Sequence, residues 1–84
     1  MDYNGWTNYA TWRVNLEILG DIQFEDKTSA DDLKEIVEDV VFSQYDGMNS
    51  LMYDYASAFI SEVNFYEIAE NINEELKLQA EYDN

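Results

Sequence analysis

An apolar stripe with helical spacing runs through residues 29–47 and limits what this chain can fold into more than any other feature. Its aliphatic residues stand at i, i+3, i+4, i+7 and i+8, namely Leu33, Ile36, Val37, Val40 and Val41. This spacing places them on one face of an α-helix. Ser29 is a favoured N-cap residue, and Gly47 can take the left-handed conformation that ends many helices. The segment therefore predicts an amphipathic helix with one buried face.

The other face of this helix is acidic. Its carboxylates are Asp31, Asp32, Glu35, Glu38 and Asp39, with Lys34 as the one basic residue beside them. Like charges four residues apart on a helix destabilise it by a few tenths of a kcal/mol per pair. Glu35 has such a neighbour on each side, so the acidity does not help the helix to form. The charges therefore need a reason other than the stability of the helix.

Three further segments have helical apolar periodicity, and little interrupts them, because the chain has no proline and three glycines. The expected core faces are Trp12, Leu16 and Leu19 in the first helix, Met52, Tyr55, Ala56, Phe59, Ile60 and Val63 in the third, and Phe65, Ile68, Ala69, Ile72 and Leu76 in the fourth. The sequence predicts an all-α fold, a compact bundle of about four helices at residues 7–19, 30–45, 50–63 and 65–79. No linker or internal repeat divides it, so we expect residues 1–84 to form a single helical domain.

Helix ends are marked in the sequence as well. Thr7 or Asn8 can cap the first helix, and Gly20 stands where a C′ residue would end it. Asn64 and Glu67 have the spacing of a capping box, in which the N-cap side chain and the carboxylate three residues later each accept from a backbone amide of the other residue. These signals predict where the first helix begins and ends and where the fourth begins.

The chain carries 19 acidic and four basic residues, no histidine and no cysteine, for a formal net charge of −15. Self-repulsion of this size destabilises a compact protein, so the charge favours a positively charged partner and disfavours direct binding to nucleic acid or to an anionic membrane. Solubility is the simpler explanation, although smaller net charges already suffice for a small domain. The start MDYNG is not a signal peptide and no apolar run is long enough to span a bilayer, so we expect a cytoplasmic protein.

The parts of common catalytic sites are missing from the sequence. Without histidine or cysteine there is no Ser-His or Cys-His pair, and no imidazole or thiolate metal site. Neither a calcium-binding loop nor a glycine-rich phosphate loop occurs. We therefore expect no enzyme activity, no metal and no other cofactor.

Rows of carboxylates on helices can imitate a nucleic-acid backbone. Side chains three or four residues apart stand about 5–6 Å apart at Cβ, and a DNA strand places a phosphate every ~3.4 Å of axis. The candidate partner-binding residues are Asp31, Asp32, Glu35, Glu38, Asp39, Asp46, Asp54, Glu67, Glu70, Glu74 and Glu75, with Tyr45 and Tyr53 as candidate aromatic contacts. For any one of these acids a solvated helix face is the simpler explanation, so the hypothesis rests on their sum.

Two segments resemble a known family. The segment TNYATWRVNLEI, residues 7–18, is similar to an NYxTWxVxLW-type signature in a family of small proteins from phages and other mobile elements. The segment SEVNFYEIAENI, residues 61–72, is similar to an SEVNWxEIAE segment in some members, which often have Trp where Phe65 stands and Glu where Ala10 stands. The resemblance implies a phage or mobile-element origin, and it transfers no activity to these residues. Small acidic phage proteins, as a class, often disarm host defences such as restriction enzymes and CRISPR effectors.

The leading hypothesis is a phage-encoded, non-enzymatic inhibitor of a host defence nuclease, an anti-CRISPR or anti-restriction protein. By DNA mimicry it would block a basic nucleic-acid-binding surface, as a monomer or homodimer in the host cytoplasm, without direct contact to nucleic acid or membrane. The alternative is an interaction or regulatory module that docks a protein partner through aromatic residues, with the acidity serving solubility. Salt weakens binding strongly in the first case and little in the second.

Overall fold

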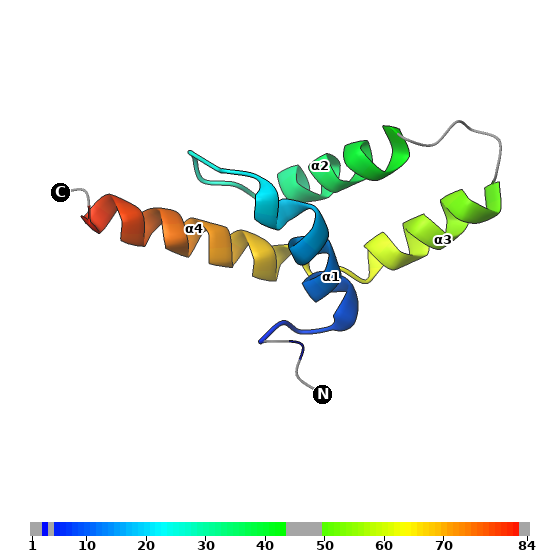
Figure 1. Ribbon diagram of the computed structural model, residues 1–84, viewed down its shortest axis with the longest axis horizontal. Helices are drawn as coiled ribbons and strands as arrows, with labels where there is room; N and C mark the ends of the chain where they lie inside the picture. The colour runs from blue at the N-terminus through cyan, green and yellow to red at the C-terminus, as the bar shows by residue number, and fades with distance from the viewer. Residues whose placement is uncertain (1–2, 4, 44–49, 83–84) are drawn as a thin grey trace.

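The computed structural model describes residue 3, residues 5–43 and residues 50–82 of the chain. These residues form four α-helices, α1 (Tyr9–Glu17), α2 (Ala30–Ser43), α3 (Ser50–Ser61) and α4 (Phe65–Tyr82), with a 3₁₀ turn, η1 (Leu19–Asp21), after α1 (Figure 1). An isolated bridge between Tyr3 and Trp6 is the only strand-like pairing in this part of the chain. The predicted all-α fold with four helices is therefore confirmed.

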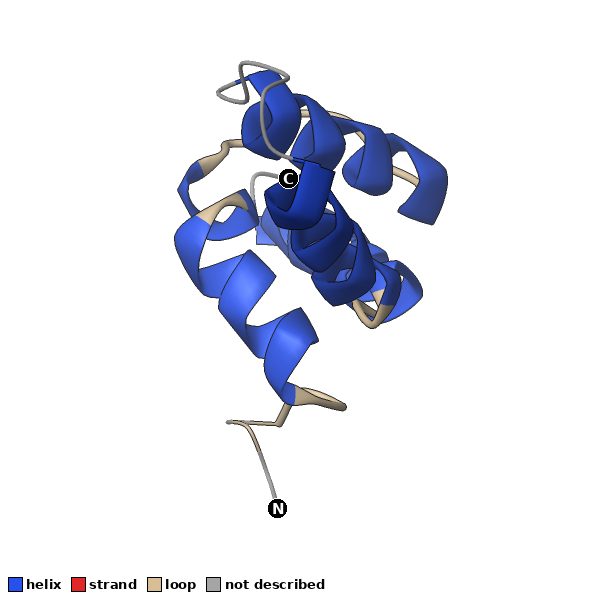
Figure 2. Ribbon diagram, turned by 90° about the vertical axis from the view of Figure 1, so that its right-hand side faces the viewer, coloured by secondary structure: helices blue, strands red, loops and turns tan. Residues whose placement is uncertain are grey.

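The helices form an elongated molecule with principal extents of 51 × 30 × 18 Å. Helix α2 contacts both α4 and α3, and α1 crosses the start of α4 (Figure 1). Helix α3 and the C-terminal half of α4 point toward opposite ends of the molecule in the same view. Figure 2, coloured by secondary structure, shows the described residues as helices and loops. No helix in the described ranges is both long enough and apolar enough to cross a membrane.

The core lies where the predicted apolar faces of α2 and α4 meet. Leu33 and Val37 of α2 and Ile68 of α4 are fully buried, which places the centre of each predicted stripe in the interior. Val40, by contrast, lies at the exposed edge of its stripe. The buried apolar residues are Ala10, Val14, Leu19, Leu33, Val37, Ile60, Val63, Phe65, Ile68 and Ala69. The faces predicted for α2 and α4 are therefore confirmed, apart from that edge.

The core face predicted for α3 is wrong over its first two turns. Met52 is 63% exposed and Tyr55 is 70% exposed, whereas Ile60 at the end of the helix is buried. The physical reason is that apolar residues cover most of the circumference of α3, so their spacing does not say which part of the arc meets the core. The side that carries Ala56 and Ile60 faces α2, and the side that carries Tyr55 faces solvent.

The face predicted for α1 is displaced within the helix, although Leu19, which follows the helix, is buried as expected. Leu16 is 57% exposed and Trp12 is half-buried, and the buried residues of the helix are Ala10, Thr11 and Val14. Thr11 has no exposed surface at all. A pattern read from apolar residues passes over a threonine, which is usually exposed unless its hydroxyl is hydrogen-bonded. The buried face of α1 is therefore centred on a polar residue that the pattern did not count.

Three predicted N-caps are confirmed. The side chains of Asn8, Ser29 and Asn64 accept hydrogen bonds from the backbone N–H groups of Thr11, Asp32 and Glu67, at 2.9, 3.1 and 3.1 Å. Between Thr7 and Asn8, the two alternatives for α1, the structure selects Asn8.

The C-terminal ends predicted for the first and fourth helices differ from those in the structure. Ile18, rather than a residue next to a left-handed Gly20, is the C-cap of α1, and Gly20 lies inside η1. Glycine is needed there for space, because a Cβ atom would stand 2.7 Å from the carbonyl oxygen of Asn15. Helix α4 continues to Tyr82, beyond the predicted end at residue 79. Gly47 and the predicted extension of the second helix to residue 45 lie outside the described residues.

Candidate interaction surface

The acidic face of α2 lies on the outside of the molecule. Its N-cap by Ser29 places Asp31 and Asp32 in the first turn, where the helix dipole favours anions. Opposite them, the burial of Leu33 and Val37 fixes the rotation of the helix about its own axis. The acidic side chains on the outer face are Asp31, Asp32, Glu35 and Asp39, all exposed, and Glu38, which is half-buried. We call these five residues the α2 row.

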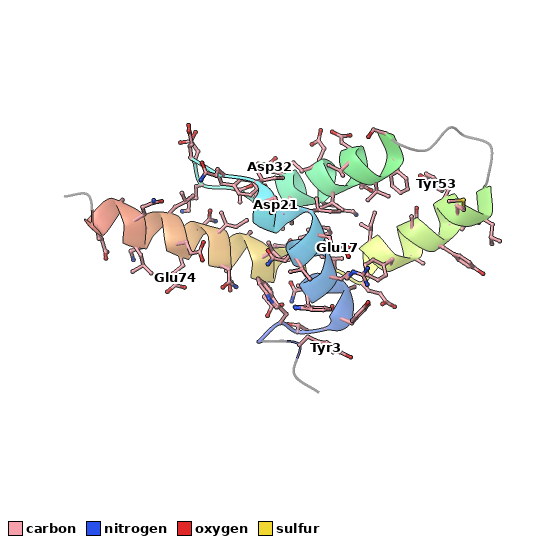
Figure 3. The ribbon with its side chains drawn as sticks, viewed as in Figure 1. Tyr3, Glu17, Asp21, Asp32, Tyr53 and Glu74 are labelled. Carbon is pink, nitrogen blue, oxygen red and sulfur yellow. The ribbon has the colours of Figure 1, made fainter. Side chains whose placement is uncertain are left out.

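The carboxylates of α4 do not continue the α2 row. Glu70 and Glu74 are exposed on the side of α4 opposite its buried Ile68, and Figure 3 shows Glu74 projecting away from α2. Because α2 and α4 pack through their apolar faces, their outer faces point to different sides of the molecule. Glu75, one position further, lies beside a hollow described below. The hypothesis drawn from the sequence rested on the sum of these acids, whereas the fold divides them between two surfaces that face different sides.

Glu67 belongs to neither surface. It is half-buried, and its Oε1 atom accepts a hydrogen bond of 3.0 Å from the backbone N–H of Thr7, in the segment that leads into α1. A capping box would have turned this carboxylate back to the N–H of Asn64. That N–H instead donates to the hydroxyl of Thr11, at 2.8 Å. The capping-box prediction is therefore correct for the Asn64 side chain and wrong for Glu67.

Thr11 is the centre of this junction between the starts of α1 and α4. Its hydroxyl donates to Oδ1 of Asn8 at 2.8 Å while it accepts from Asn64. The Nδ2 group of Asn8 in turn donates to the carbonyl oxygen of Glu62, at 2.9 Å. These atoms come from residues 7–18 and 61–72, the two segments that carry the family resemblance. Several polar residues of those segments thus hold the fold together. The sequence does contain a signal for this junction, because in both segments a capping Asn is followed three residues later by Thr or Glu.

The remaining predicted site residues come from residues 45–54, and the two that the structure describes differ in their surroundings. Asp54 on α3 is exposed. Tyr53 lies against Phe42 at the end of α2, with ring centroids 4.7 Å apart and planes inclined by 30° (Figure 3). Tyr45 and Asp46 lie outside the described residues.

Apolar and aromatic side chains are exposed on α3. They are Leu51, Met52, Tyr53 and Tyr55, and Tyr66 at the start of α4 is exposed as well. Asp54 is the one charged residue in this helix. This helix therefore carries little charge for a chain whose formal net charge is −15.

The side chain of the single arginine makes its polar contacts within α1. Arg13 donates from Nε to the carboxylate of Glu17 and from Nη1 to the hydroxyl of Tyr9. These two partners, Glu17 first, raise the pKa of Arg13 above its usual value. Over the described ranges this is the one ion pair within 4 Å, so no lysine neutralises the α2 row at that distance.

A hollow of about 700 Å³ lies between α4 and the connection that follows η1. The residues that line it are Trp6, Asn15, Leu19, Gly20, Ile22, Gln23, Phe24, Glu25, Asn71, Ile72, Glu75, Leu76 and Gln79. The connection is fastened to α4 by Asn73, whose side-chain amide accepts from the N–H of Thr28 and donates to its carbonyl oxygen, both at 2.9 Å. In Figure 1 this connection, in cyan, lies above the N-terminal half of α4.

None of the described residues form a group of three or more carboxylates placed to hold a metal ion. Comparison of the chain with models of protein families, with curated proteins and with solved structures finds no match to any of them.

Proposed function

We propose that this chain is an acidic, non-enzymatic inhibitor that occupies the basic nucleic-acid-binding surface of a host defence nuclease, a CRISPR effector or a restriction enzyme. The observation that carries the proposal is the α2 row, an outward-facing set of carboxylates with no cation among the described residues within ion-pair distance. Because this row and the acids of α4 face different sides, we assign the contact with the partner to α2, where the carboxylates are densest.

The α2 row has the properties that imitation of a phosphate backbone requires. Its charges stand on a helix whose position is fixed by Leu33 and Val37, so the charges are held in a defined pattern before binding. Asp31, Glu35 and Glu38 follow one another at intervals of four and three residues, which gives spacings of about 5–6 Å between Cβ atoms. A partner with a basic channel would associate with such a row rapidly and in a salt-dependent way.

The resemblance of residues 7–18 and 61–72 to small phage and mobile-element proteins supports an anti-defence role in the cytoplasm of a host cell. Mobile elements encounter nucleases whose DNA-binding surfaces are basic, and a chain of net charge −15 is repelled by DNA itself but attracted to such surfaces.

The test is inhibition of DNA cleavage by purified CRISPR effectors and restriction enzymes, measured at several salt concentrations and against competing DNA. The informative variant neutralises the α2 row by Asp31→Asn, Glu35→Gln and Asp39→Asn. Its matched control, Glu70→Gln, Glu74→Gln and Glu81→Gln, changes the net charge by the same amount on the exposed face of α4. We expect the first variant to lose inhibition and the second to retain it. Equal loss in both would show that only net charge matters, and unchanged inhibition in the first would refute mimicry by α2.

A second candidate function is favoured by the exposed apolar surface of α3. A protein partner docked on Tyr55 and Met52, which are 70% and 63% exposed, would bury aromatic area of the kind that dominates interface energetics. In that case Tyr55→Ser would abolish partner binding. Raising the salt concentration would hardly change the affinity of the wild-type protein. The α2 triple variant would then bind as the wild type does, which separates the two functions in one experiment.

A further inference from the structure

We propose that the hollow between α4 and residues 22–25 is a binding site for an arginine side chain of the basic partner. The inference rests on the proposed function for the identity of that partner, whereas the chemistry of the site can be tested alone. The hollow has a volume of about 700 Å³, and neither lysine nor arginine lines it.

The walls of the hollow are held in place by contacts within the fold. On one side, the connection is fastened at its far end by the paired hydrogen bonds between Thr28 and Asn73. At its near end, η1 packs against the fold through the buried Leu19, and Gly20 leaves room for the Asn15 carbonyl beside it. Trp6 is packed against the core, and its backbone N–H donates to the Tyr3 carbonyl oxygen at 2.9 Å. The site is therefore formed before any ligand enters.

The lining combines two kinds of group that together select a guanidinium. Trp6 and Phe24 supply aromatic surface, on which a planar cation stacks favourably. Glu25 and Glu75 supply carboxylates on opposite walls, which accept the forked N–H groups of arginine. Nucleic acid is repelled by the same carboxylates. A metal ion is disfavoured because no group of three ligating side chains occurs in the described residues.

The polar side chains in and beside the hollow fall into two groups. Asn71 and Asn73 use their side-chain amides in hydrogen bonds to the backbone. Within the part of the chain that the structure describes, no hydrogen bond or ion pair engages the carboxylates of Glu25 and Glu75. These two carboxylates are therefore available to a cationic ligand without breaking a contact of the fold.

The test uses the full chain, labelled with ¹⁵N, and N-acetyl-arginine methylamide as the probe. We expect the indole N–H signal of Trp6 to shift saturably as the probe is added, whereas the citrulline analogue, which is neutral and of similar shape, leaves it unchanged. The informative variant is Glu25→Gln with Glu75→Gln. Its matched control is Asp26→Asn with Glu74→Gln, which removes the same charge at neighbouring exposed positions that do not line the hollow.

We expect the affinity for the probe to fall roughly tenfold or more in the Glu25/Glu75 variant, because charge-assisted hydrogen bonds are lost, and to stay within about twofold in the control. No saturable shift of Trp6, an equal response to citrulline, or equal loss in both variants would overturn the site. Nuclease inhibition that persists in the Glu25/Glu75 variant while the probe no longer binds would overturn the proposal that an arginine of the partner enters this hollow, and it would leave the proposed function intact. Probe binding without inhibition of any nuclease would refute the proposed function and retain the site.

Discussion

The hydroxyl of Thr11 accepts the backbone N–H of Asn64 at 2.8 Å, and so joins the first turn of α1 to the residue that caps α4, 53 positions later in the sequence. The same hydroxyl donates to the side chain of Asn8, the cap of α1. One fully buried oxygen therefore serves the N-termini of two helices at once.

Thr11→Val should destabilise the protein by about 1–3 kcal/mol, because the substitution keeps the shape of the side chain but leaves the N–H of Asn64 without its acceptor. The free energy of unfolding from urea denaturation measures this loss. Thr11→Ser is the control, since it keeps the hydroxyl and removes one methyl group, at a cost of about 1 kcal/mol. A valine variant as stable as the serine variant would contradict the role given to this oxygen.

Asn73→Asp should loosen the connection between η1 and α2. The aspartate still accepts from the Thr28 N–H, but it places a second acceptor against the Thr28 carbonyl, so one hydrogen bond of 2.9 Å becomes a repulsion. We expect a loss of about 1–3 kcal/mol and faster hydrogen exchange at the Thr28 amide. Asn71→Asp introduces the same charge two residues earlier, where the side chain is exposed, and should leave that amide protected. Equal protection of Thr28 in both variants would rule out the fastening role of Asn73.

Glu35→Lys should stabilise the protein by about 1 kcal/mol. It replaces two repulsive i,i+4 contacts, with Asp31 and Asp39, by two attractive ones. Glu74→Lys makes the same change in net charge on α4 and should stabilise less, because Glu70 is its only acidic neighbour at that spacing. Thermal unfolding at low salt measures the difference, which should shrink at high salt as the charges are screened. A Glu35→Lys protein that is less stable than the wild type would show that the α2 row contributes to folding.

Tyr55→Ser should change the free energy of unfolding by no more than about 0.5 kcal/mol, because the tyrosine is mostly exposed and serine has a similar helix propensity. Ile60→Ala, one and a half turns later in α3, should cost about 2–5 kcal/mol, since Ile60 is buried. Chemical denaturation of the two variants therefore tests which side of α3 meets the core. Comparable losses at both positions would mean that Tyr55 is packed in solution.

These variants also mark where the sequence was a sufficient guide. Helices α2 and α4 have one apolar arc and one acidic arc, so periodicity alone located the buried Leu33, Val37 and Ile68 and the exposed carboxylates of the α2 row. Helix α3 is apolar around most of its circumference, so the same method could not choose a face. Thr11 was missed because its burial depends on the hydrogen bond from the N–H of Asn64, which lies 53 positions later and which no local pattern contains.

The candidate interaction surface was also predictable from the sequence only in part. Exposure of the acids on α2 and on most of α4 was predictable, because charged side chains opposite an apolar stripe face solvent. The separation of the two acidic surfaces, the use of Glu67 by Thr7 and the hollow beside Glu75 were not. Each of these depends on how helices distant in sequence are placed against one another.

The junction between α1 and α4 has a consequence for the order of events during synthesis. Its hydrogen bonds join residues 7–11 to residues 62–67, so they close a loop that includes most of the chain. While the ribosome is still adding α2 and α3, Asn8 and Thr11 can form their mutual hydrogen bond, but their partners Glu62 and Asn64 have not yet been synthesised. Helix α1 can gain its final anchorage only after residue 67 has left the exit tunnel, which makes the docking of the two ends a late step.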